Sequence, residues 1–135
     1  DDKLYDEFII EPNKEISKKI REFSSETRII HFPRRSAKKY IKFIKEVECD
    51  VISIDETCPD TIIKEAEKRD IAIQGNMNPT DLLGDENELS KKTIQILEKF
   101  RHNKHIFNLS HGILPETPIK NVERVIKLVK NHEFT

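Results

Sequence analysis

The stretch that decides the fold covers residues 105–118 and reads HIFNLSHGILPETP. Its apolar residues 106–109 are typical of a short buried strand. Thr117 and Pro118 predict a helix start, with a hydroxyl cap followed by proline at the first helical position. Between strand and helix, a tight loop holds His111. A histidine in the loop that follows a strand lies where α/β proteins place their chemistry.

The same alternation of strand, loop and helix extends back through the chain. Apolar periodicity predicts a first helix over residues 4–23, kinked or restarted at Pro12, and then four strand–helix pairs. The predicted strands cover 28–32, 50–54, 71–74 and 106–109, and the helices after them cover 36–47, 59–68, 86–101 and 118–131. Ser36 is the expected cap of the second helix. Alternation at this spacing predicts an α/β fold with parallel strands and right-handed crossovers.

Composition narrows the class of protein. The chain has 135 residues, enough for one ordinary domain, and a formal net charge of −1 gives it no overall attraction to nucleic acid or anionic membrane. No run of 18 apolar residues is present, and the acidic amino terminus lacks an apolar signal core. Cys49 and Cys58 show no metal-type spacing, so we expect two reduced thiols in a cytoplasmic protein. The first residue is not methionine, and we expect a processed product or a piece of something longer.

Four parallel strands are too few for a closed barrel, which takes about eight, and an open sheet of four leaves two edges unpaired. A resemblance accounts for this mismatch. Residues 105–118 resemble the carboxyl-terminal signature of uroporphyrinogen decarboxylases, roughly H-I-F-N-L-G-H-G-x-x-P-x-T-P, with Ser110 in place of the usual glycine. That family folds as a (β/α)8 TIM barrel. The resemblance implies that residues 1–135 form a single carboxyl-terminal portion, the last four β/α units of an incomplete barrel.

The resemblance also implies a role for His111. In the family, the histidine of N-L-G-H-G lines the substrate cleft and faces the pyrroles and their carboxylates. We therefore expect His111 to bind substrate as a polar or cationic contact rather than as the first proton donor, since a charge-assisted hydrogen bond is about twice as strong as a neutral one. The alternative is a histidine that only bonds its own loop. The family's arginine loop and catalytic aspartate lie upstream, so no catalytic residue is expected in this segment.

Two further stretches resemble family motifs. Residues 74–79, QGNMNP, resemble Q-G-N-L-D-P, and Gln74 or Asn76 is a candidate for the pocket floor, although turn chemistry alone explains the pattern. Residues 32–35, FPRR, resemble F-P-R-G, so Arg34 is a candidate contact to a polycarboxylate. Solvated surface is the alternative for Arg34.

Four other polar residues have no clear role from spacing. Arg35 stands where the family's glycine allows close backbone approach. Asp55 follows a strand and could hold a loop or point into the barrel mouth, and the structural role is favoured. His102 and His105 lack further ligands at suitable spacing, so no metal site is expected and both are interpreted as surface residues.

The implied activity is that of a carboxy-lyase of haem biosynthesis, which converts uroporphyrinogen III into coproporphyrinogen III and carbon dioxide without a cofactor. The implied partners are the tetrapyrrole substrate, the missing amino-terminal part of the barrel, and a second subunit in a homodimer. The segment alone is not expected to be catalytically competent. Two alternatives stay open: an inactive remnant of a split gene, and a cobalamin-linked methyltransferase. The second is disfavoured because its zinc-binding cysteine is absent from the last strand's loop.

Overall fold

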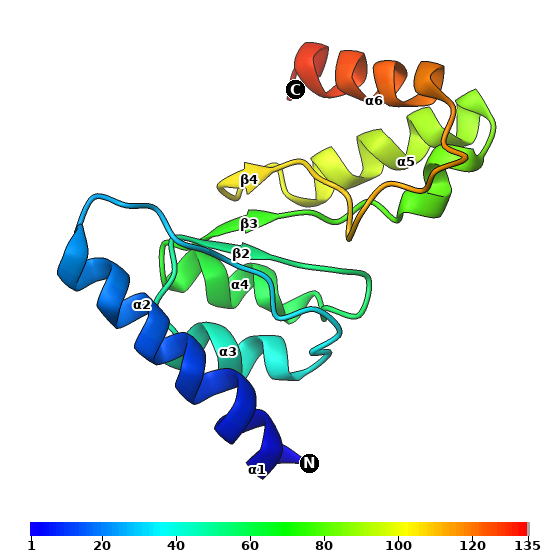
Figure 1. The fold of residues 1–135 in the computed structure, drawn as a ribbon. Helices are drawn as coiled ribbons and strands as arrows, with labels where there is room; N and C mark the ends of the chain where they lie inside the picture. The colour runs from blue at the N-terminus through cyan, green and yellow to red at the C-terminus, as the bar shows by residue number, and fades with distance from the viewer. Residues whose placement is uncertain (135) are drawn as a thin grey trace.

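The computed structural model describes residues 1–134, and these form a sheet with helices packed along one side (Figure 1). Four parallel strands lie in the order β1-β2-β3-β4, which are Ile30–His31, Val51–Ser53, Ala72–Gln74 and His105–Ile106. The predicted α/β fold and its parallel topology are confirmed. Each strand is shorter than predicted. A single parallel bridge between Met77 and Leu109 continues the pairing beyond β4.

Each strand leads into a helix, as predicted. These helices are α3 (Lys39–Glu46), α4 (Thr61–Lys68), α5 (Glu86–Lys99) and α6 (Ile119–Asn131). In α3, Tyr40, Phe43 and Ile44 recur at helical spacing and are buried against the sheet. Burial of one such side chain contributes about 1.5–3 kcal/mol. The main core cluster consists of Ile10, Tyr40, Phe43, Ile44, Val47, Ile52, Ile54, Ile62, Ala66, Ile73 and Phe100.

The amino-terminal helix accommodates Pro12 because the turn before it is π-helical, which is wider than an α-helical turn. It comprises α1 (Asp2–Tyr5), a π-helical segment η1 (Asp6–Ile10) and α2 (Glu11–Phe23). Proline has no N–H to donate, so the helix restarts there with proline in its first turn, as predicted. The side-chain amide of Asn13 donates to the carbonyl of Ile9 at 2.7 Å, close to this restart.

Two predicted caps are wrong. Ser36 does not cap α3: its hydroxyl accepts from Tyr5 Oη at 2.9 Å, and α3 begins at Lys39 without a side-chain cap. Thr117 does not cap α6, because its buried Oγ1 has no hydrogen-bond partner within residues 1–134 and Pro118 occupies the cap position. For Ser36, a contact distant in sequence replaces the predicted cap. For α6, the backbone places Pro118 instead of Thr117 at the cap position.

The turn-rich segment after β3 contains an element that periodicity did not reveal. A 3₁₀ helix, η2 (Pro79–Leu83), begins after Asn78, whose Oδ1 accepts from the Thr80 amide at 3.0 Å. Leu82 is buried and joins a second core cluster under α5 and α6. Asn121 of α6 donates to the carbonyl of Leu82 at 2.7 Å and so fixes η2 to the last helix.

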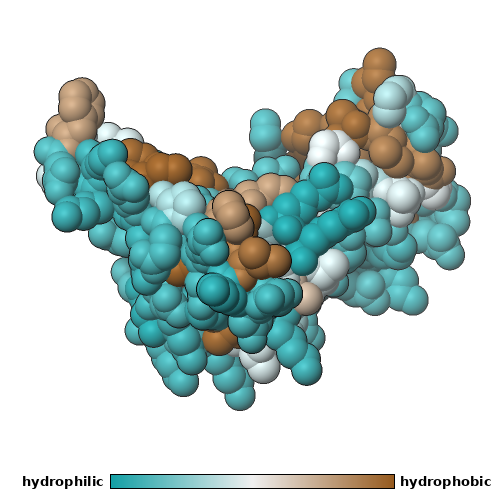
Figure 2. Space-filling model, turned by 60° about the horizontal axis from the view of Figure 1, so that its bottom comes forward, coloured by the Kyte–Doolittle hydropathy of each residue, from teal (hydrophilic) through white to brown (hydrophobic). Residues whose placement is uncertain are grey.

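The face of the sheet opposite the helices carries apolar side chains that are only partly covered. Strand pairing places Ile30 beside Val51, and the alternation of side chains along a strand puts Phe32 on the same face. Ile30 is 51% exposed, Phe32 is 42% exposed, and Ile106 of β4 is 43% exposed. Figure 2 shows hydrophobic side chains on both arms of the molecule, around a hollow between them. This open face lacks the cover that a soluble sheet normally has.

Asp50, at the amino end of β2, ties the base of the sheet to α2. Its carboxylate accepts from the Ile29 amide at 2.8 Å, from Arg21 at 2.7 Å and from Arg28 at 2.9 Å. Burial alone would raise the pKa of Asp50, but these hydrogen bonds outweigh it and lower the pKa to about 2. A lowered pKa in the folded state stabilises the fold above the ordinary pKa of the group, and the contribution is lost as pH falls towards the folded pKa.

We therefore expect the difference in unfolding free energy between the chain and its Asp50→Asn variant to be constant from pH 7 to about 4. It should then shrink as pH falls from about 4 to about 2, because in this range the carboxylate of the unfolded chain binds a proton while that of the folded chain stays ionised. Urea unfolding of both proteins at several pH values measures this difference. A difference that persists unchanged at pH 2 would contradict the role given to Asp50.

Candidate functional site

The four residues expected to bind substrate all lie at or beyond the carboxyl ends of the strands. Gln74 ends β3 and Asn76 follows it, while Arg34 lies in the loop after β1 and His111 in the loop after β4. Because the strands are parallel, these loops share one edge of the sheet (Figure 1). In α/β folds this edge is where ligands bind.

Gln74 and Asn76 are each held by one hydrogen bond from the side-chain amide. Gln74 Nε2 donates to Ser53 Oγ at 2.5 Å, which links β3 to β2 on the open face. Asn76 Nδ2 donates to the main-chain carbonyl of Asp55 at 3.3 Å. Both residues are half-buried, so their positions are fixed while part of each side chain is accessible.

Ser110 fastens the loop of His111 to the loop of Asn76. The Ser110 amide donates to the Met77 carbonyl at 2.7 Å, and its hydroxyl donates to the Asn76 carbonyl at 3.1 Å. Ser110 is 1% exposed. His111 itself is half-buried, and its Nδ1 lies 3.2 Å from the carbonyl oxygen of Gly112 within the same loop. The sequence marked Ser110 only as a departure from the family glycine, so its anchoring role was missed.

Asp55 joins three of the loops at this edge. Its Oδ2 accepts from the Arg35 amide at 2.5 Å, and its Oδ1 accepts from the amide and hydroxyl of Thr57 at 2.9 and 2.6 Å. Burial would raise the pKa of Asp55, but hydrogen bonds from Thr57 and Arg35 outweigh it and lower the pKa below its ordinary value. Asp55 is therefore a carboxylate that holds loops, which was the favoured interpretation of the sequence.

Arg34 and Arg35 follow β1, the first strand of the sheet, whereas His111 follows β4, the last. Both arginines line a hollow of about 350 Å³ against the amino-terminal helix and Phe43 of α3. No described residue forms an ion pair with either guanidinium within residues 1–134. Arg35 has φ of 57°, a left-handed conformation that favours glycine, and it occupies the position where the family motif has glycine. The structure thus brings Gln74, Asn76 and the His111 loop together and leaves Arg34 apart from them.

The two histidines near β4 differ. His102 is exposed, as expected, but the surface interpretation of His105 is wrong. His105 Nε2 lies 2.6 Å from the Gly75 carbonyl oxygen, and its ring stacks on Phe100 at 4.5 Å. Burial lowers the pKa of His105, and the contact with Gly75 only partly opposes this. His105 therefore packs in the structure as a largely neutral side chain.

Within residues 1–134 no three side chains of His, Cys, Asp or Glu gather into a possible metal site. Both cysteines are free thiols. Burial raises the pKa of Cys49 to about 11 and that of Cys58 to about 12, so neither thiol ionises readily near neutral pH. None of the helices in the described part of the chain is long and apolar enough to cross a membrane.

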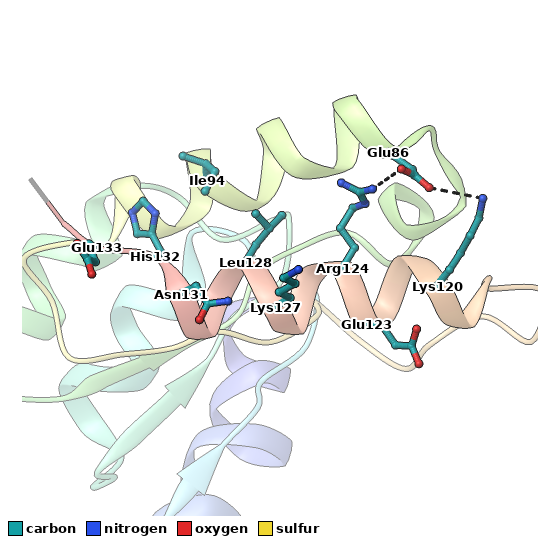
Figure 3. A pocket seen from close by; sticks show the side chains of 10 residues that line it. All are labelled: Glu86, Ile94, Lys120, Glu123, Arg124, Lys127, Leu128, Asn131, His132 and Glu133. Atoms are coloured by element: carbon teal, nitrogen blue, oxygen red, sulfur yellow. Dashed lines mark hydrogen bonds and ion pairs between the residues drawn. The ribbon is translucent and has the colours of Figure 1, made fainter.

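A larger hollow of about 670 Å³ lies between α5 and α6 (Figure 3). Figure 3 shows Lys120 and Arg124 of α6 reaching towards Glu86 of α5, with which both form ion pairs. Ile94 and Leu128 contribute its apolar lining. None of the residues expected to bind substrate lines this hollow, so the candidate site is the strand edge and not the groove between these helices.

Comparison with known proteins gives one consistent family. The model of the family described as uroporphyrinogen decarboxylase (URO-D) matches residues 1–132. A uroporphyrinogen decarboxylase of Rickettsia africae is 43% identical over 129 residues, which cover 96% of this chain and 37% of the relative. One from Orientia tsutsugamushi is 40% identical over 129 residues, covering 95% of this chain and 37% of that protein. The chain thus spans little more than a third of the length of these relatives.

Proposed function

The chain belongs to the uroporphyrinogen decarboxylase family, and on that basis we propose that it supplies the carboxyl-terminal wall of a uroporphyrinogen decarboxylase's substrate cleft. The observation that carries the proposal is that the stretches resembling family motifs meet at one edge. Asn76, from the Q-G-N stretch, is bonded through Ser110 to the loop that holds His111. The predicted fold, four β/α units of an incomplete barrel, is that of the family.

In the proposed reaction, the complete site removes carbon dioxide from the acetate side chains of uroporphyrinogen III. Such a site has to hold a polycarboxylate and stabilise the charge that develops on the pyrrole, which preorganised polar groups in a dry cleft can do. The proposal gives this chain the task of binding. His111 Nε2 has no hydrogen-bond partner within residues 1–134, and its protonated ring could donate a charge-assisted hydrogen bond to a substrate carboxylate.

Both edges of the sheet favour completion by an amino-terminal barrel portion. β1 and β4 each have one unpaired side, and closure takes about eight strands. Apolar side chains are also exposed on the two outer flanks of the half-barrel, at Leu4, Phe8 and Ile16 on one and at Ile119 and Ile126 on the other. A complementary portion with four strands would pair both edges and cover both flanks.

A second copy of this chain fits these edges less well. The amino-terminal helix already covers β1, since Ser17 Oγ lies 2.8 Å from His31 Nε2. α6 already covers the segment after β4, where Val122 and Phe107 join the same cluster. Pairing β4 of one copy with β1 of another would bring α6 and α2 into the same space. The proposed partner therefore supplies four strands and only the three helices between them.

The proposal is tested by complementation. The 135-residue chain alone is expected to produce no coproporphyrinogen, and mixing it with the amino-terminal portion of a close relative is expected to restore turnover. In the mixture, His111→Asn should lower kcat/KM by about tenfold or more, because a charge-assisted contact to substrate is lost. The exposed His102→Asn is the matched control and should leave turnover unchanged.

Turnover by the chain alone would contradict the proposal that this chain binds substrate and that the amino-terminal portion supplies the catalytic residues. Equal turnover with and without His111 would contradict the binding role given to that residue. No turnover in a mixture that forms a stable complex would favour the alternative of an inactive remnant, for which Arg35 and Ser110 at family glycine positions are the supporting observation.

A further inference from the structure

Asp55 is a buried carboxylate without a cationic partner. It is 1% exposed, and the groups that hydrogen-bond its carboxylate are all neutral: the amides of Arg35 and Thr57 and the hydroxyls of Thr57 and Tyr40. No ion pair involves it within residues 1–134. A buried charge is costly unless hydrogen bonds compensate it, so a carboxylate in this position needs all these donors at once.

The groups around Asp55 come from different loops of the candidate site. Arg35 belongs to the loop after β1, Thr57 to the loop after β2, and Asn76, which donates to the Asp55 carbonyl oxygen, to the loop after β3. Tyr40 Oη completes the set by accepting from the Asp55 amide at 3.3 Å. One residue thus fixes the relative positions of three loops at the edge where substrate is proposed to bind.

The hydrogen bond from the Arg35 amide to Asp55 stabilises a strained backbone conformation. The Arg35 backbone is left-handed, with φ of 57°, and an arginine in this conformation is strained relative to its ordinary states. The short hydrogen bond from its amide to Asp55 Oδ2 compensates this strain and holds the Arg34–Arg35 pair in place. Without the carboxylate, the loop would be free to relax into another conformation.

We propose that Asp55 is a positioning residue: it fixes the loop of Arg34 and Arg35 relative to the loop of Asn76, and thereby determines how tightly a polycarboxylate is bound. The identity of the substrate in this inference rests on the proposed function. That Asp55 holds the loops together follows from its hydrogen bonds alone. Asp50 offers a matched control, because it is a carboxylate with three donors at the opposite end of the same strand.

The first experiment needs no activity. Amide hydrogen exchange is measured in the chain itself and in its Asp55→Asn and Asp50→Asn variants. Asp55→Asn is expected to speed exchange of the Arg35 amide about tenfold or more, because asparagine offers one acceptor oxygen to the three donors of Arg35 and Thr57 that the carboxylate serves. The Ile29 amide, which donates to Asp50, should be unchanged. Asp50→Asn should do the reverse. Unchanged exchange at Arg35 in the Asp55→Asn chain would overturn the proposal.

The second experiment uses the complemented enzyme. Asp55→Asn should raise KM about tenfold while kcat changes less than about threefold, and Asp55→Glu, which keeps the charge but displaces it, should give an intermediate KM. Asp50→Asn should destabilise the protein without raising KM. A fall in kcat alone, or an equal rise of KM in the Asp50→Asn enzyme, would show a merely structural role. Absence of turnover in the unmutated mixture overturns the proposed function and the substrate role of Asp55 together, whereas the exchange result still decides whether Asp55 holds the loops.

Discussion

Replacing Gly75 by alanine is expected to lower the unfolding free energy by at least about 3 kcal/mol, enough to unfold most of a marginally stable chain. Gly75 has φ of +133°, a conformation that residues with a side chain rarely adopt. A Cβ atom added there would lie 2.7 Å from the Ile54 carbonyl oxygen and 3.2 Å from Ile54 Cγ1. Ile54 is buried directly after β2 and its amide donates to the Gln74 carbonyl, so its backbone cannot move away without disturbing the sheet.

Gly112→Ala is the matched control for this prediction. No atom lies within 4 Å of the position that its Cβ would occupy, so the substitution should change the unfolding free energy by less than about 0.5 kcal/mol. Urea unfolding followed by circular dichroism measures both variants. Similar stability of the Gly75→Ala and Gly112→Ala chains would show that the segment between β3 and η2 can relax, contrary to the geometry described.

Replacing Ile30 by aspartate is expected to separate the stability of the chain from its ability to form a complete barrel. Ile30 is 51% exposed on the open face, so its replacement should cost the isolated chain only about 1 kcal/mol. In a closed barrel the same position would be interior, where an unpaired carboxylate costs several kcal/mol. Complementation by the amino-terminal portion should therefore weaken by about 100-fold or more.

The measurements are urea unfolding of the isolated chain and titration of the amino-terminal portion until turnover or complex formation saturates. Ile30→Val serves as the control, since it keeps an apolar side chain of similar shape and should reduce complementation by less than about tenfold. Equal complementation by the Ile30→Asp and Ile30→Val chains would show that the open face is not enclosed in the complex. Unfolding of the isolated Ile30→Asp chain would show that the face is already part of its core.

Much of the fold could be predicted from the sequence because its signals are local. The apolar spacing of Tyr40 and Ile44 predicted α3, and β-branched runs such as Val51 to Ile54 predicted the strands, since amphipathic periodicity needs only neighbouring residues. The motif around His111 predicted the family, and the match along residues 1–132 confirmed it. Placing Gln74, Asn76 and His111 at one edge followed from parallel pairing alone.

Other features were decided only by the tertiary structure. Ser36 matches the pattern of a helix cap, yet its hydroxyl accepts a hydrogen bond from Tyr5, 31 positions away. His105 looked like a surface residue, but it is stacked on Phe100 under the Gly75 loop. Ser110 and Asp55 join loops through bonds that span 34 and 20 positions. The sequence determines elements because helical and strand periodicity act over a few residues, whereas these hydrogen bonds depend on which loops the parallel sheet brings together, and no local pattern specifies that.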